Sequence, residues 1–136
     1  SPGEKYIYPL GQKGLGKFMV TKMTESSDGT LFFGTIGSGL YRYNKESDSF
    51  EHCPMAGADY IYNMRFHMSG YLILLTDRGI LCYHPQTTDM KILDAENQLH
   101  LSAVNDGCGL LVCHDGEVLV GDPIFFFFFI RYLAGT

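Results

Sequence analysis

The richest local gathering of side chains able to recognise a ligand is the segment Tyr60–Arg65, which reads Tyr-Ile-Tyr-Asn-Met-Arg. An aromatic ring can lie against the apolar face of a sugar, while amide and guanidinium groups hydrogen-bond its hydroxyls. The alternative is that the two tyrosines pack between layers of the fold and that the arginine pairs with an acidic neighbour. The predicted ligand-contacting residues, two of them from strands expected beside this segment, are Tyr60, Tyr62, Asn63, Arg65, Lys22 and Asn105.

Other reactive side chains form no pattern that indicates catalysis or metal binding. The five histidines contain no His-x-x-x-His pair, and the four cysteines are too widely spaced for zinc knuckles. His52-Cys53 and Cys113-His114 are adjacent pairs, but neighbours on a strand point to opposite faces. We therefore expect no catalytic residue, no metal and no cofactor. Buried thiols are favoured over a disulfide, for which Cys108 with Cys113 is the one local candidate.

Charge and hydropathy narrow the possible partners. Ten Lys and Arg stand against fifteen Asp and Glu, a net charge of −5, so the basic stripe that nucleic acid requires is missing. No apolar run approaches the roughly 20 residues of a membrane-spanning helix. We expect no nucleic-acid contact by this segment.

An internal repeat organises the chain. Residues 28–35 and 39–43 (DGTLFFGT and GLYRY) recur as residues 69–76 and 79–83 (SGYLILLT and GILCY), at offsets of 41 and 40 residues. A weaker third copy places Gly109 opposite Gly70 and Gly116 opposite Gly79. Alternating or apolar runs that end at glycine-bearing turns are typical of β-hairpins. A period of about 40 residues with four strands per unit predicts β-propeller blades.

The predicted fold is all-β, a partial β-propeller of about three four-stranded antiparallel blades within one domain, residues 1–136. Residues 1–15 are expected to carry the outer strand of a preceding blade at Tyr6-Ile7-Tyr8. The blades cover 16–55, 56–95 and 96–130, and 131–136 form a tail. The predicted strands are Phe18–Met23, Leu31–Thr35, Leu40–Tyr43, Phe50–Cys53, Ile61–His67, Leu72–Thr76, Ile80–Tyr83, Met90–Leu93, His100–Asn105, Leu110–Cys113, Val118–Gly121 and Ile124–Ile130.

The first unit resembles the two-component regulator propeller repeat, whose core reads acidic-Gly-x-Leu-aromatic-aliphatic-Gly-Thr followed by Gly-Leu-x-Arg-Tyr. Residues 28–35 and 39–43 match it, with Phe32 where the family usually has Trp. The second unit has Leu75 in place of the glycine before the threonine, and the third keeps only the glycines and apolar strands. The resemblance covers residues 18 to 122. We expect the motif residues to serve architecture more than binding.

The resemblance implies a function in ligand sensing. Such repeats form the periplasmic sensor of membrane-anchored hybrid histidine kinases of gut Bacteroidetes, which detect oligosaccharides. For this chain we expect the signal to pass through dimer geometry. By this reading the chain is a non-catalytic periplasmic segment of such a receptor. The alternatives are a protein-interaction scaffold, or a fragment of a propeller-fold glycan hydrolase or lyase, for which Asp59, Asp94 and Asp106 would be the carboxylate candidates.

The chain departs from the family in having about three blades, where closed propellers have four to eight, and no kinase, receiver or DNA-binding segment. Open blade faces and strand edges invite pairing, so we expect a homodimer or other self-association. The run Ile124–Ile130, with five consecutive phenylalanines, breaks the alternation of a half-exposed outer strand. A strand buried in a chain–chain contact is favoured there over a membrane anchor.

Overall fold

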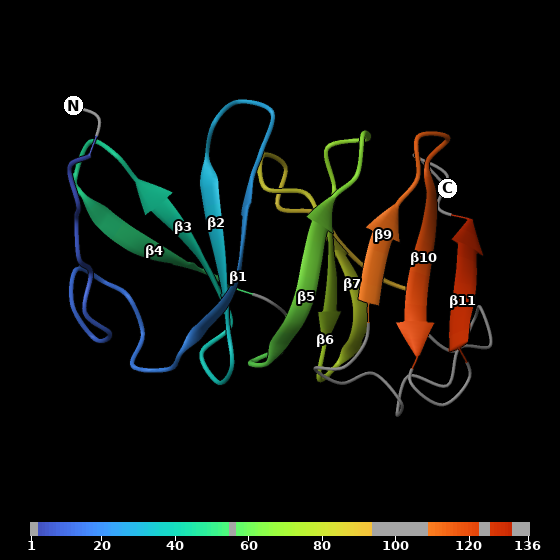
Figure 1. Ribbon diagram of the computed structural model, residues 1–136, viewed down its shortest axis with the longest axis horizontal. Coiled ribbons are helices and arrows are strands. Elements are labelled where there is room, and N and C mark those ends of the chain that lie inside the picture. Colours follow the sequence, from blue (N-terminus) through green and yellow to red (C-terminus); the bar gives the residue numbers. More distant parts are fainter. Residues whose placement is uncertain (1–2, 55–56, 94–108, 123–125, 132–136) are drawn as a thin grey trace.

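The computed structural model describes residues 3–54, 57–93, 109–122 and 126–131, and these form three antiparallel β-sheets arranged side by side (Figure 1). No helix occurs within these ranges, and hence none that could span a membrane. The all-β prediction is confirmed. The strands are β1 (Val20–Glu25), β2 (Leu31–Thr35), β3 (Leu40–Asn44) and β4 (Ser49–Cys53) in the first sheet, β5 (Ile61–Phe66), β6 (Leu72–Thr76), β7 (Gly79–Tyr83) and β8 (Met90–Leu93) in the second, and β9 (Gly109–Val112), β10 (Glu117–Asp122) and β11 (Phe126–Arg131) in the third.

In each sheet the strands pair in the order in which they follow along the chain. The eight strands predicted for the first two units all occur, each within two residues of its predicted bounds. The largest shift is at β1, which begins at Val20 because the ladder with β2 starts where Val20 pairs with Thr35. Phe18 and Met19, predicted to open this strand, are exposed.

In the third unit, each strand has a position in the sheet that is one earlier than predicted. Gly29, Gly70 and Gly116 each have φ near +90° and each donates its N–H to the carbonyl three residues earlier, at 2.9–3.0 Å. Gly116 is therefore equivalent to Gly70, and not to Gly79 as predicted. Consequently β9, β10 and β11 are the first, second and third strands of their unit, where the prediction made them the second, third and fourth.

The physical reason is a longer spacing between the second and third units, 46 residues from Gly70 to Gly116. The predicted first strand His100–Asn105 lies outside the described residues, in the stretch 94–108. A signal for the correct alignment exists in the sequence: Asp115-Gly116 and Gly121 repeat Asp28-Gly29 and Gly34 at a constant offset of 87 residues.

The sheets pack face to face and bury two cores. Every residue of β6 and β7 is buried, since the second sheet lies between the other two. A strand covered on both faces reads as a continuous apolar run, which explains the Leu-Ile-Leu-Leu and Ile-Leu-Cys sequences. The core between the first and second sheets includes Phe32, Leu40, Ile61, Met64, Leu72 and Leu74. The core between the second and third sheets includes Ile73, Leu75, Ile80, Leu110, Val118 and Val120.

The remaining face of the first sheet is partly covered by the N-terminal segment. The predicted strand at Tyr6-Ile7-Tyr8 does not form, because residues 4–9 pair with no strand. Instead Leu15 is buried, and the Tyr8 ring meets Phe50 edge-on at 5.4 Å. The Phe50 N–H donates to the Lys13 carbonyl at 2.7 Å. This segment therefore lies where the prediction placed a preceding blade.

Asp48 fastens the N-terminal segment to the β3–β4 turn. Its carboxylate accepts hydrogen bonds from Lys13, Tyr43 and Tyr8. These hydrogen bonds, that of Lys13 first, lower the pKa of Asp48 to about 2.

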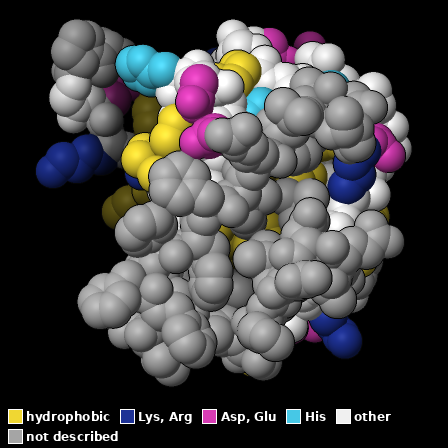
Figure 2. Space-filling view, turned by 90° about the vertical axis from the view of Figure 1, so that its right-hand side faces the viewer, with side chains coloured by type: hydrophobic (Ala, Val, Ile, Leu, Met, Phe, Trp, Pro, Cys, Tyr) yellow, Lys and Arg dark blue, Asp and Glu magenta, His cyan; other side chains and the backbone are white. Residues whose placement is uncertain are grey.

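Seen from the side of the third sheet, the described acidic and basic side chains are scattered among neutral ones and form no single-sign patch there (Figure 2).

Candidate functional site

The predicted aromatic pair comes together at the start of β5. The rings of Tyr60 and Tyr62 are stacked, with centroids 6.4 Å apart and planes 28° apart. Tyr60 is 42% exposed, whereas Tyr62 is half-buried and packs against the core between the second and third sheets. The two rings therefore form a stacked pair, which we call the Tyr60–Tyr62 platform. Tyr60 is its exposed member, whereas Tyr62 packs between two sheets, which was the alternative for these tyrosines.

Neighbouring elements fix the position of Tyr60. The Asp77 carboxylate accepts hydrogen bonds from the N–H groups of Asp59 and Tyr60, at 3.1 and 3.2 Å. Tyr60 also forms an isolated bridge with Ile36, whose N–H donates to the Met19 carbonyl at 3.1 Å. Exposed aromatic and apolar side chains are thus held close to the beginnings of β1 and β5.

The polar residues of the predicted site are not all on one face. Asn63 and Arg65 pair in register with Leu75 and Ile73, so they belong to the face of the second sheet that meets the third. Arg65 is exposed and forms no ion pair with the described residues. Lys22 pairs with Gly34 on the first sheet, on the face that meets the second. Although β1 lies against β5, Lys22 and Arg65 therefore belong to different intersheet faces.

Several candidates from the sequence fall beyond the described part of the chain, namely Asn105, Asp94 and Asp106. Among the cysteines, Cys53 and Cys82 are buried free thiols, as predicted, and Cys113 is a partly exposed free thiol. Burial raises the pKa of Cys82 to about 12, so it is a poor nucleophile at neutral pH. No cluster of three His, Cys, Asp or Glu side chains able to hold a metal occurs among the described residues.

A cleft that the sequence did not reveal lies between the first and second sheets, where the β1–β2, β5–β6 and β7–β8 turns meet. We call it the turn cleft; its volume is about 460 Å³. The rings of Phe32 and Phe66 line it edge-to-face, with centroids 5.6 Å apart. The polar residues that line it are Ser26, Ser27, Asp28, Thr30, Arg42, His67, His84 and Gln86.

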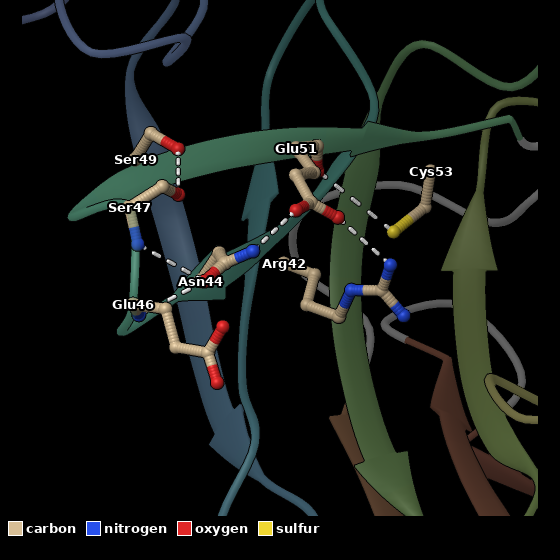
Figure 3. A network of polar contacts seen from close by, with 7 residues as sticks. All are labelled: Arg42, Asn44, Glu46, Ser47, Ser49, Glu51 and Cys53. Atoms are coloured by element: carbon tan, nitrogen blue, oxygen red, sulfur yellow. Dashed lines mark hydrogen bonds and ion pairs between the residues drawn. The ribbon is translucent and has the colours of Figure 1, made fainter.

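Arg42 belongs to a braced polar network on the β3–β4 hairpin (Figure 3). Its Nη2 donates to Glu51 Oε2 at 2.8 Å, and Asn44 Nδ2 donates to Glu51 Oε1 at 2.8 Å. These bonds, that of Asn44 first, lower the pKa of Glu51. Asn44 Oδ1 in turn accepts the Glu46 N–H at 2.9 Å. Guanidinium and carboxylate, each about two-fifths exposed, are thus held in fixed positions beside the cleft.

The two histidines lining the cleft have different roles. His67 Nε2 lies 2.9 Å from the Gly116 carbonyl, and its Nδ1 accepts the Ser69 N–H at 3.0 Å. This ring therefore ties the β5–β6 turn to the β9–β10 turn. His84 Nδ1 accepts the N–H groups of Gln86 and Thr87 at 3.3 and 3.4 Å, so this ring orders its own β7–β8 turn.

Sequence reasoning missed Arg42 because it lies inside the repeat motif and was assigned to architecture. A usable signal was the second unit, where the equivalent of the Arg42–Glu51 pair is Cys82 with Lys91. A sheet of the same topology forms there without the ion pair. The arginine is therefore not needed to build the hairpin.

Comparison with known proteins does not assign this chain to a family. No family model matches the chain, and no curated protein matches it. Among solved structures, the chain is similar to one described as the extracellular domain of a one-component system, BT4673, from B. thetaiotaomicron, with 16% sequence identity and a TM-score of 0.46. The match covers 92% of this chain and 23% of that one. A likeness of this size establishes no shared function.

Proposed function

We propose that this chain is a β-propeller segment that senses an oligosaccharide without catalysis, in the periplasmic part of a membrane-anchored hybrid two-component receptor. The observation that carries the proposal is the arrangement of the first strands. β1 lies against β5, and β5 lies against β9, while successive sheets pack face to face. Propeller blades are arranged in this way around a central axis, and the motif of the first unit resembles the repeat of such sensors.

The ligand site proposed for this function is the Tyr60–Tyr62 platform with Asn63 and Arg65 on the same strand. Lys22, on the neighbouring first strand β1, would be a further contact, and Asn105, also predicted for this site, lies outside the described residues. The exposed ring of Tyr60, stacked on the half-buried Tyr62, and the exposed Arg65 offer both the apolar and the polar contacts that a sugar requires. No cofactor is proposed.

Calorimetric titration with a panel of neutral and acidic oligosaccharides tests the proposal, with product analysis of the same mixtures. We expect saturable binding without turnover, weakened by Tyr60→Ala. Ile92→Ala, which shortens another exposed apolar side chain, is the matched control. Turnover would favour the hydrolase or lyase alternative. An absence of binding across the panel would contradict oligosaccharide sensing, and binding that Tyr60→Ala leaves unchanged would contradict the platform.

Self-association is proposed as the partner interaction. The outer face of the first sheet is partly covered by its own N-terminal segment, whereas Leu111 on β9 of the third sheet is 50% exposed. We therefore expect dimerisation to use the third sheet. Light scattering across a concentration series should give the mass of a dimer, which Leu111→Lys should reduce. A monomer at every concentration would contradict the proposal.

A further inference from the structure

The turn cleft continues into a second cleft on the first sheet. The second cleft, also about 460 Å³, shares Asp28, Thr30 and Arg42 with the first. It extends past Arg42 to Lys45, Glu46 and Glu51 of the β3–β4 hairpin. We call the two together the Arg42 groove. Each part lies within the roughly 300–1,000 Å³ of pockets that hold small ligands, so the groove has room for more than one ring.

The charges along the groove disfavour an anionic ligand. Arg42 and Lys45 are opposed by Asp28, Glu46 and Glu51, which leaves one net negative charge. Hydrogen bonds from Ser26 and Thr30 lower the pKa of Asp28 to about 2, and the pKa of Glu51 is lowered as well. Both carboxylates are therefore ionised at neutral pH. A phosphate, a sulfate or a chain of carboxylates would be repelled at such a surface.

The donors and acceptors of the groove suit hydroxyl groups. A guanidinium carries five N–H donors, and in the described part of the chain Arg42 uses one of them, toward Glu51. The carboxylate of Glu51 is held in place by Asn44 and Arg42. Planar groups held rigidly can contact two adjacent hydroxyls at once. Phe66, which is partly buried and packs against the fully buried Phe32, supplies apolar surface for the face of a ring.

A peptide fits the turn cleft less well. Extended peptides bind chiefly by adding a strand to an open sheet edge. The turn cleft is lined by three turns, by β2 and β3, which each pair with strands on both sides, and by Phe66 at the end of the edge strand β5. A single residue of an unpaired strand edge therefore lines it, which is too little for an extended peptide to add a strand.

We propose that the Arg42 groove is a second carbohydrate site, which binds a neutral oligosaccharide of two or more sugar units across the guanidinium of Arg42. The proposal rests on the proposed function for its ligand class, but not for its position. The groove lies at the end of the sheets that carries the β1–β2 and β5–β6 turns, whereas Tyr60 precedes β5 at the other end (Figure 1).

The experiment is calorimetric titration of the whole chain with cellotetraose and maltotetraose. Tetragalacturonate serves as the acidic comparator and tetraalanine as the peptide comparator. The variants are Arg42→Gln and Arg42→Lys, with Lys5→Gln as the control that removes an exposed charge elsewhere. Because hydrogen bonds to a charged group contribute about 1.5–3 kcal/mol, Arg42→Gln should weaken binding of one neutral tetrasaccharide by about tenfold or more. Arg42→Lys should also weaken it, since the fork is lost.

The outcomes separate this proposal from the proposed function. Neutral tetrasaccharide binding that depends on Tyr60 but not on Arg42 would overturn the groove and leave oligosaccharide sensing intact. Tighter binding of tetragalacturonate or tetraalanine would overturn the ligand class assigned to the groove. If no sugar binds to the unmodified chain, both proposals fail. Gln86→Ala, at an exposed turn position lining the cleft, provides a second variant should Arg42→Gln fail to fold.

Discussion

The β3–β4 hairpin of the first sheet and the β7–β8 hairpin of the second occupy the same place in their sheets but differ in chemistry. Arg42 opposite Glu51 in the first is replaced by Cys82 opposite Lys91 in the second. Cys82 is fully buried, whereas Arg42 and Glu51 are about two-fifths exposed beside a cleft. The same topology forms with either pair, so the ion pair is available for binding.

What the two sheets share is equally informative. Thr35 donates its hydroxyl hydrogen to the Gly39 carbonyl, and Thr76 does the same to the Gly79 carbonyl, at 2.7 and 2.8 Å. Both threonines are buried. Shared features of the repeat therefore close the hairpins, and the differing ones carry the chemistry specific to each unit.

The largest expected effect concerns the buried centre of the second sheet. Leu74 is fully buried in the core with the first sheet, so Leu74→Ala should lower the free energy of unfolding by about 2–5 kcal/mol. Leu111→Ala, at a half-exposed position, should change it by about 0.5 kcal/mol or less. Urea unfolding measures both. Equal losses would contradict the view that the second sheet is the buried centre.

The shared turns predict a smaller and equal effect in both sheets. Thr76→Val removes the bond to Gly79 and leaves the Arg78 N–H without its 3.0 Å acceptor. Thr35→Val does the same to the bonds with Gly39 and the Ser38 N–H. Each should cost about 1–3 kcal/mol in thermal unfolding. A loss confined to one sheet would show that these turns are not equivalent.

The attachment of the N-terminal segment predicts a pH-dependent difference that belongs to the first sheet. The folded pKa of Asp48, about 2, lies below the ordinary value of 3.8, so its stabilising effect is present above pH 4 and is lost as pH falls toward 2. Asp48→Asn should therefore reduce stability at pH 7 and match the unmodified chain near pH 2. Tyr43→Phe, which removes one donor, should give a smaller loss in the same window. A difference that persists unchanged at pH 2 would contradict the role assigned to the carboxylate.

The smallest expected effect is that of the Arg42–Glu51 pair on stability. Exposed ion pairs contribute little to folding, so Arg42→Gln should leave the melting midpoint nearly unchanged in differential scanning calorimetry. Glu51→Gln is the matched variant. A loss as large as that of Leu74→Ala would mean that Arg42 serves architecture after all, as its place in the motif suggested.

The sequence was most informative where structure is local. Glycine turns at a constant spacing predicted the strands of the first two units, since each hairpin depends on residues close in the chain. The third unit was misaligned because Gly109 was equated with the turn glycine Gly70, although Gly109 is the first residue of β9. The turn cleft could not be predicted, because it depends on how turns from two units, about 40 residues apart, meet in space. The rings of Tyr60 and Tyr62 do stack, but the face that each side chain occupies could not be predicted, because a bulge lies between Ile61 and Asn63.

The central claim is that the polar residues of the Arg42 groove bind a neutral sugar within a framework that the repeat builds. A two-dimensional ¹H–¹⁵N NMR titration of the unmodified chain with cellotetraose and maltotetraose tests this most directly. The account predicts saturable shifts at the Thr30 amide, the Arg42 side-chain Nε–H and the Gln86 amides. Saturable binding that shifts other signals but none of these would contradict it. An absence of shifts with either sugar would contradict it as well.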